Sequence, residues 1–149
     1  MKFFIQRVLN SRVLVENKTV GEIGKGYLVL IGLGIGDNEA MADRMLDKLV
    51  KLRIFEDENG KTNLSIKDVG GALLLISQFT LYANCKKGNR PSFTDALGGE
   101  ESEKLYNYIV DRARGLMDTV ECGIFGADMK VELLNDGPFS VMLDSDVIF

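Results

Sequence analysis

The order of the short apolar runs constrains the fold of this chain more than any other feature of its sequence. Three or four strands precede a first amphipathic segment, one strand separates that segment from a second, and three strands follow. This order lacks the regular alternation of strand and helix that is typical of a doubly wound parallel sheet. It predicts an α+β fold with mainly antiparallel sheets rolled toward a barrel and two amphipathic helices. The expected strands cover residues 3–8, 12–16, 19–23, 27–33, 72–81, 120–125, 129–135 and 139–143.

Two segments have the periodicity of amphipathic helices. Asp37 and Asn38 can cap a first helix that runs to about Leu52, because apolar side chains recur in it at helical spacing. A second helix is predicted from Glu100 to Met117 on the same grounds. The chain has 149 residues, which is the length of one domain, so we expect a single domain over residues 1–149.

The chain contains no histidine. This excludes a Ser-His-Asp triad and a Cys-His dyad, the usual means of activating a nucleophile. It also excludes zinc held by histidine, and two cysteines cannot form a site of four cysteines. We therefore expect neither a metal nor a cofactor, and an enzyme with this sequence must obtain its proton transfers elsewhere.

The net charge of −4 and the pI of about 4.9 argue against a protein that coats nucleic acid non-specifically, but they leave room for a local basic patch. No apolar run is long enough to cross a bilayer, so no membrane association is expected. Residues 1–9 do not have the pattern of a signal peptide. The sequence therefore predicts a cytoplasmic, reducing location with Cys85 and Cys122 as free thiols.

Three segments are unusually polar or constrained for their positions. Ser77-Gln78-Phe79-Thr80 ends the most hydrophobic strand, either as a strand running into solvent or as a site at the rim of the sheet. Lys86, Lys87 and Arg90 lie in a segment without acidic residues, either as a solvated loop or as a contact for phosphates. Asn135-Asp136-Gly137-Pro138 predicts a hairpin turn between two strands, and X–Pro bonds in folded proteins are mostly trans.

These three segments, in this order, resemble the D-aminoacyl-tRNA deacylases, and the similarity extends over essentially the whole chain. The paired Ser-Gln-Phe-Thr and Asn-x-Gly-Pro motifs are the most specific part of it. One departure is that Phe139 and Ser140 follow Gly-Pro, where the family usually has a small β-branched residue and then Thr. Further matching segments are residues 5–8, 24–26, 52–57, 68–71, 77–82, 87–93 and 126–129.

The resemblance implies an enzyme that hydrolyses the ester between a D-amino acid and the 3′ end of tRNA, and that clears glycine mischarged on tRNA for alanine. It implies a homodimer in which Gly137-Pro138, as a Gly-cis-Pro motif, enters the partner's pocket and excludes L-side chains. Arg7 is expected to orient that motif. The implied catalytic segment consists of Ser77, Gln78, Phe79 and Thr80, and the implied substrate-binding residues are Gly137, Pro138, Arg7, Lys86, Lys87 and Arg90.

The resemblance also implies that backbone amides near Phe79 and Thr80 hold the oxyanion while the terminal 2′-hydroxyl of the tRNA assists the attack. An unassisted threonine hydroxyl is a weak nucleophile, and no histidine can deprotonate Thr80. Two alternatives remain open from the sequence. Thr80 could act as a covalent nucleophile if Lys86 or Lys87 is desolvated beside it, or the chain could be a non-catalytic module that binds aminoacyl-tRNA.

Overall fold

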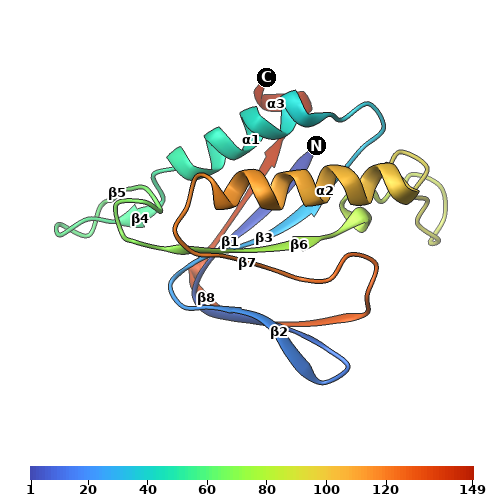
Figure 1. The fold of residues 1–149 in the computed structure, drawn as a ribbon. Helices are drawn as coiled ribbons and strands as arrows, with labels where there is room; N and C mark the ends of the chain where they lie inside the picture. The colour runs from blue at the N-terminus through green and yellow to red at the C-terminus, as the bar shows by residue number, and fades with distance from the viewer.

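A computed structural model describes residues 1–149 as one strongly curved sheet covered on one face by two helices (Figure 1). The sheet has six strands, with the order β2-β1-β3-β6-β7 and with β8 paired to β1. A separate small hairpin joins two further strands. The strands are β1 (Lys2–Val15), β2 (Lys18–Ile23), β3 (Gly26–Gly32), β4 (Phe55–Glu56), β5 (Thr62–Leu64), β6 (Ala72–Ser77), β7 (Val120–Cys122) and β8 (Met129–Asp144).

Strand β1 organises the sheet because it has three antiparallel partners. It pairs with β3 through its first half, with β2 through its second half, and with β8 along its whole length. The pairs β3–β6 and β6–β7 are parallel. The nearly closed, barrel-like α+β architecture with a mainly antiparallel sheet confirms the predicted fold class.

Helices α1 (Glu39–Lys51) and α2 (Gly99–Arg114) lie side by side over the sheet (Figure 1). The predicted cap of α1 is present, since the Asn38 side chain accepts a hydrogen bond from the Met41 N–H at 3.0 Å. The predicted apolar stripe of α1 is buried in a core of 24 residues that also includes strand and α2 side chains. Arg112 of α2 donates to Asp43 of α1 at 2.9 Å, which joins the outer sides of the two helices.

Three sequence predictions about local structure were wrong. The separate strands over 3–8 and 12–16 are one strand, β1. The strand predicted over 72–81 ends at Ser77, and the 3₁₀ helix η1 (Phe79–Tyr82) follows it. Asn135–Pro138 is not a hairpin turn between two strands. β8 continues through it as a bulge, because β1 pairs with β8 on both sides of the register shifts around Val8.

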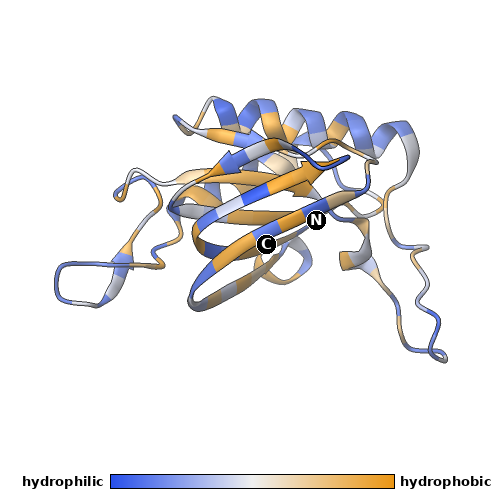
Figure 2. Ribbon diagram, turned by 90° about the horizontal axis from the view of Figure 1, so that it is seen from below, coloured by the Kyte–Doolittle hydropathy of each residue, from blue (hydrophilic) through white to orange (hydrophobic).

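The sequence patterns also missed some short elements. Strands β4 and β5 form a hairpin around the turn at 57–60, and α3 (Ser145–Ile148) follows β8 near the N-terminus (Figure 1). Hydrophilic and hydrophobic positions alternate along the strands seen from below, as expected for a sheet with one buried face (Figure 2). None of the helices has the length and apolar character that a membrane-spanning helix requires.

Candidate active site at the end of β6

The segment Ser77–Thr80 lies at the rim of the sheet, where β6 ends. The Gln78 N–H still donates to the Ile31 carbonyl at 2.7 Å, and the chain then turns into η1. Hydrogen bonds of this turn use the N–H groups of Gln78, Leu81 and Ala83. Phe79 and Thr80 are the first two residues of η1, so their N–H groups have no partner within that helix and can hold a developing negative charge.

The Thr80 side chain is exposed, and its Oγ1 accepts a hydrogen bond from Nε2 of Gln78. Burial raises the pKa of the neighbouring Tyr82, and the carboxylates of Asp37, Asp144 and Asp146 raise it further. The Tyr82 phenol therefore keeps its proton at neutral pH. A protonated phenol cannot accept a proton, so Tyr82 cannot replace histidine as a general base.

A cavity of about 380 Å³ opens beside this segment. Ser77, Gln78 and Phe79 form one wall, and the start of α2 and the approach to β8 form the others. Most of the lining is apolar, which suits a flat ring or an apolar side chain better than a charged group.

Two parts of this cavity were not assigned from the sequence. Residues 126–129 belong to the lining, although the resemblance gave them no role. Ser102 also lines the cavity and is only 7% exposed. A signal for Ser102 was available, because it is a polar residue on the apolar stripe of α2, in helical register with Leu105 and Ile109.

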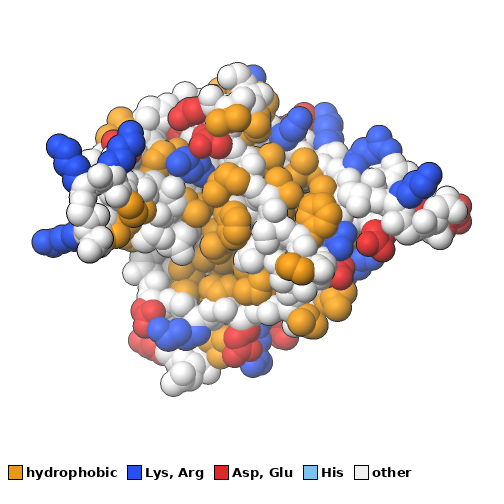
Figure 3. Space-filling view, turned by 180° about the vertical axis from the view of Figure 1, so that it is seen from behind, with side chains coloured by type: hydrophobic (Ala, Val, Ile, Leu, Met, Phe, Trp, Pro, Cys, Tyr) orange, Lys and Arg blue, Asp and Glu red, His pale blue; other side chains and the backbone are white.

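The basic loop, residues 84–92, projects next to η1. Asn84 and Ser92 close it with two backbone hydrogen bonds of 2.7 and 3.0 Å, and the Phe93 ring packs edge-on against Phe79 at 5.0 Å. Figure 3 shows basic side chains at the end of the molecule where this loop projects. Lys86, Lys87 and Arg90 are exposed and form no ion pair. The structure thus brings the first two predicted segments together.

The third segment lies elsewhere in the same chain. Gly137 and Pro138 are exposed on the bulge of β8, and the peptide bond between them is cis. Neither residue lines the cavity. Arg7 beside them is level with Leu73 of β6, four residues before Ser77, so the two places are roughly 13 Å apart along the strands.

Arg7 holds this bulge from the interior. Arg7 is 5% exposed, and its guanidinium donates from Nε to the Asp136 carbonyl at 2.9 Å and from Nη1 to the Ile54 carbonyl at 2.6 Å. The Asp136 carboxylate lies 3.4 Å from the same Nε. The arginine therefore contacts the motif that the resemblance expects it to orient.

Comparisons with known proteins show the family of this chain. A family model described as D-Tyr-tRNA(Tyr) deacylase matches residues 4–144. The chain belongs to this family. A protein named D-aminoacyl-tRNA deacylase from Clostridium kluyveri is 51% identical to this chain over 149 residues, which is 100% of each chain. A protein of the same name from Variovorax paradoxus is 55% identical to it over 143 residues, which is 96% of this chain and 98% of the relative. The family and enzyme class predicted from the resemblance, that of an ester hydrolase, are thereby confirmed.

Two solved structures share the deacylase fold. A protein described as c-Myc DNA Unwinding Element Binding Protein superposes with a TM-score of 0.92 at 37% identity, over 97% of this chain and 98% of that one. A structure described as a probable eukaryotic D-amino acid tRNA deacylase superposes with a TM-score of 0.79 at 19% identity, over 95% and 97%. The second likeness concerns the fold alone.

Proposed function

We propose that this protein hydrolyses the ester bond of D-aminoacyl-tRNA and releases the free D-amino acid and tRNA in the cytoplasm. The observation that carries the proposal is the pair of free N–H groups at Phe79 and Thr80 beside an apolar cavity. Relatives of the same length at about 50% identity bear the name of this activity.

The chemistry needs few side chains. Ester hydrolysis passes through a tetrahedral oxyanion, and one preorganised N–H donor contributes roughly 10²–10³-fold in rate. The Phe79 and Thr80 amides supply two such donors. The attack is assisted by the terminal 2′-hydroxyl of the tRNA, which takes the place of the histidine base that this chain lacks.

Rejection of L-amino acids requires a second copy of the chain. Gly137-Pro138 is exposed and remote from the cavity of its own protomer, so it acts as a wall in the pocket of the partner. Backbone atoms exclude any L-side chain by steric clash whatever its identity, while they accept many D-residues. Glycine has no side chain to reject, so glycine mischarged on tRNA for alanine is also cleared.

The surface around the bulge favours such a homodimer. β8 pairs only with β1, which leaves its other edge unpaired over a long strand. Apolar side chains lie exposed on and beside these strands, at Leu9, Leu133, Leu134 and Met142. Figure 3 shows apolar side chains gathered at the centre of the face opposite to that of Figure 1. An apolar surface next to an open sheet edge is typical of an interface.

The 3′ end of the tRNA reaches the cavity past the basic loop. Lys86, Lys87 and Arg90 offer three cations without competing partners, and they lie on the side of η1 to which Phe93 packs. Contacts to phosphates position a nucleic acid without reading its sequence. A short cationic loop therefore suffices for RNA contact in a protein with a net charge of −4.

The direct test measures release of tyrosine from D-Tyr-tRNA and from L-Tyr-tRNA by the purified protein. We expect rapid hydrolysis of the D-ester and near-background hydrolysis of the L-ester. Equal hydrolysis of both would contradict the proposal. Saturable binding of aminoacyl-tRNA without loss of the ester would also contradict it and would identify the chain as a non-catalytic binding module.

A further inference from the structure

Phe139 follows the Gly137-Pro138 wall and makes contacts that reach back to Arg7. Its ring covers the Arg7 guanidinium, with 4.7 Å between the guanidinium carbon and the ring centroid. Its N–H donates to the Asn135 side chain at 2.6 Å, and that side chain in turn donates to Ser140 Oγ at 3.1 Å. The residues on both sides of Gly137-Pro138 are thus tied together.

The ring matters because Arg7 is a buried cation. A charge that is only 5% exposed must be compensated by polar or π partners. The edge of the guanidinium is occupied by the carbonyls of Asp136 and Ile54. The guanidinium carbon also lies over the Phe139 ring, whose π face supplies an attraction that an aliphatic side chain does not have.

Gly137 of the Gly137-Pro138 wall lies close to both Phe139 and Arg7. A Cβ placed on Gly137 would be 2.9 Å from the Phe139 nitrogen and 3.5 Å from Nη2 of Arg7. Gly137 has a φ of 144°, a backbone conformation that favours glycine. A shift of Arg7 would therefore be transmitted directly to the position of the wall.

We infer that Phe139 is a positioning residue, which fixes Gly137-Pro138 by covering the Arg7 guanidinium and thereby sets how strictly L-aminoacyl esters are rejected. The inference rests on the proposed function. It concerns selectivity and leaves the oxyanion donors at Phe79 and Thr80 untouched. Phe139 acts through Arg7 and does not contact the substrate.

The test compares Phe139→Leu, which keeps apolar bulk, with Phe139→Tyr, which keeps the π face. The readout is the ratio of kcat/KM for D-Tyr-tRNA to that for L-Tyr-tRNA. A partly unfolded preparation does not alter this ratio, because the active fraction cancels. We expect Phe139→Leu to lower the ratio by about tenfold to thirtyfold, the loss implied by a desolvated cation–π contact. Phe139→Tyr should stay within about twofold of wild type on the same basis.

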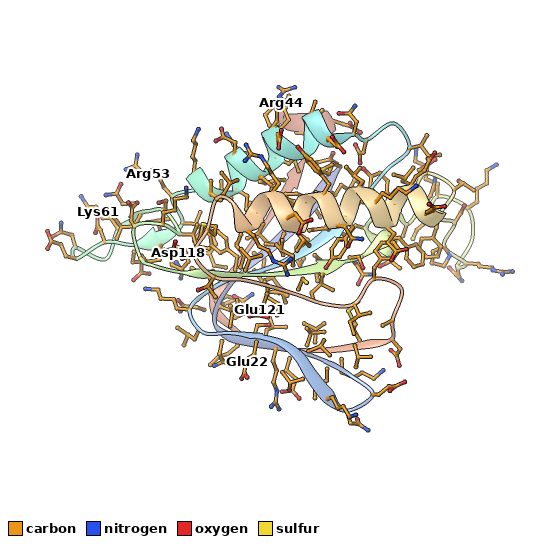
Figure 4. The ribbon with its side chains drawn as sticks, viewed as in Figure 1. Glu22, Arg44, Arg53, Lys61, Asp118 and Glu121 are labelled. Carbon is orange, nitrogen blue, oxygen red and sulfur yellow. The ribbon has the colours of Figure 1, made fainter.

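The contact between Arg44 and Phe149, the second cation–π contact that involves an arginine, provides a matched control for the substitution of Phe by Leu. The Arg44 guanidinium lies 3.9 Å from the Phe149 ring centroid, and Figure 4 shows Arg44 at the top of the molecule, beside α3. Phe149→Leu should leave the ratio unchanged. The double variant Arg7→Lys with Phe139→Leu should be no less selective than Arg7→Lys alone, since the ring acts through the arginine.

The outcomes separate the inference from the function beneath it. A wild-type protein that hydrolyses both esters equally, or neither, overturns both. A selective wild type with an unchanged ratio in Phe139→Leu overturns the inference alone. The inference is likewise overturned if Phe139→Tyr lowers the D-to-L ratio as far as Phe139→Leu does. It is also overturned if the double variant loses selectivity by the product of the factors lost in Arg7→Lys and in Phe139→Leu.

Discussion

At the scale of single residues, the role of Thr80 decides between two mechanisms. Its hydroxyl is exposed, accepts a hydrogen bond from Gln78, and has no histidine near it, because the chain has none. The partner of the hydroxyl is thus a neutral amide, which cannot take its proton. Under the proposed mechanism, we therefore expect the side chain to shape the rim of the site and the backbone N–H to hold the oxyanion.

The substitution Thr80→Val should lower kcat by less than about tenfold, which corresponds to about 1.4 kcal/mol. Loss of a covalent nucleophile costs far more, about 10⁶-fold in a serine protease. Reactions with labelled D-Tyr-tRNA that are stopped by rapid quenching should contain no labelled acyl-enzyme. An inactive Thr80→Val variant that remains folded, together with a trapped acyl-enzyme, would establish the covalent mechanism instead.

Residue types alone show some contacts and hide others. The absence of histidine and the Ser-Gln-Phe-Thr sequence are local features, and they suffice to suggest a site at the rim of the sheet. The contact between Phe139 and Arg7 joins residues 132 positions apart, so no local pattern reveals it. Ser102 stands out locally as a polar residue on the apolar stripe of α2, but the cavity that it lines forms only where α2 meets the end of β6.

At the scale of elements, the helices were predictable and the bulged strand was not. The stripe of α1 and its Asn38 cap depend on spacing within the segment, which sequence shows directly. The course of β8 through Gly137-Pro138 depends on β1, which pairs with it on both sides of the bulge. A four-residue turn pattern is compatible with either outcome until the partner strand is known.

The start of α1 provides a stability prediction. Replacing Asn38 with alanine removes the acceptor of the Met41 N–H, so we expect the free energy of unfolding to fall by about 1 kcal/mol. The melting temperature should fall by about 2–4 °C in a thermal scan. Asn38→Ser keeps a capping oxygen, so its free energy of unfolding should fall much less. An equal fall in both variants would exclude capping as the cause.

The basic loop provides a binding prediction. Each phosphate contact to a single strand contributes about 0.7 to the slope of log affinity against log salt concentration. Lys86→Ala, Lys87→Ala and Arg90→Ala should therefore each reduce the slope for tRNA by about 0.7. The measurement is a titration of uncharged tRNA at several salt concentrations.

A control for the loop lies at the opposite end of the molecule. Figure 4 shows Lys61 and Arg53 there, and Lys61 forms no ion pair. The β4–β5 hairpin that carries Lys61 also contains Glu56, Asp57 and Glu58, so its local charge does not favour RNA. Lys61→Ala should leave the slope unchanged. A decrease equal to that of Lys86→Ala would show that the contact is not confined to the loop.

At the scale of the whole molecule, one protomer contains all parts of the predicted site but does not bring them together. Ser77–Thr80 and the basic loop lie at one end of β6, whereas Gly137-Pro138 lies on the exposed bulge of β8. The resemblance predicted a site shared between two copies, and the separation within one chain supports that arrangement. Discrimination should therefore depend on assembly, whereas the proposed oxyanion donors at Phe79 and Thr80 lie in a single protomer.

Charge placed on the apolar surface tests this dependence. Leu134 is 52% exposed on β8, directly before the bulge motif Asn135–Pro138. Leu134→Lys should yield a monomer in sedimentation velocity, because an ammonium group buried in an interface without a partner is costly. Val147→Lys adds the same charge at a site on α3 that is 80% exposed, and it should leave the oligomeric state unchanged.

In Leu134→Lys, the oligomeric state and the selectivity for the D-ester should change together. A Leu134→Lys monomer lacks the partner's Gly137-Pro138, so its ratio of D-ester to L-ester hydrolysis should fall toward one even where the D-ester is still cleaved. A monomer that keeps the wild-type ratio would show that the wall comes from the same chain as the cavity. A variant that stays dimeric would place the interface on another surface, and the unpaired edge of β8 would then need a different explanation.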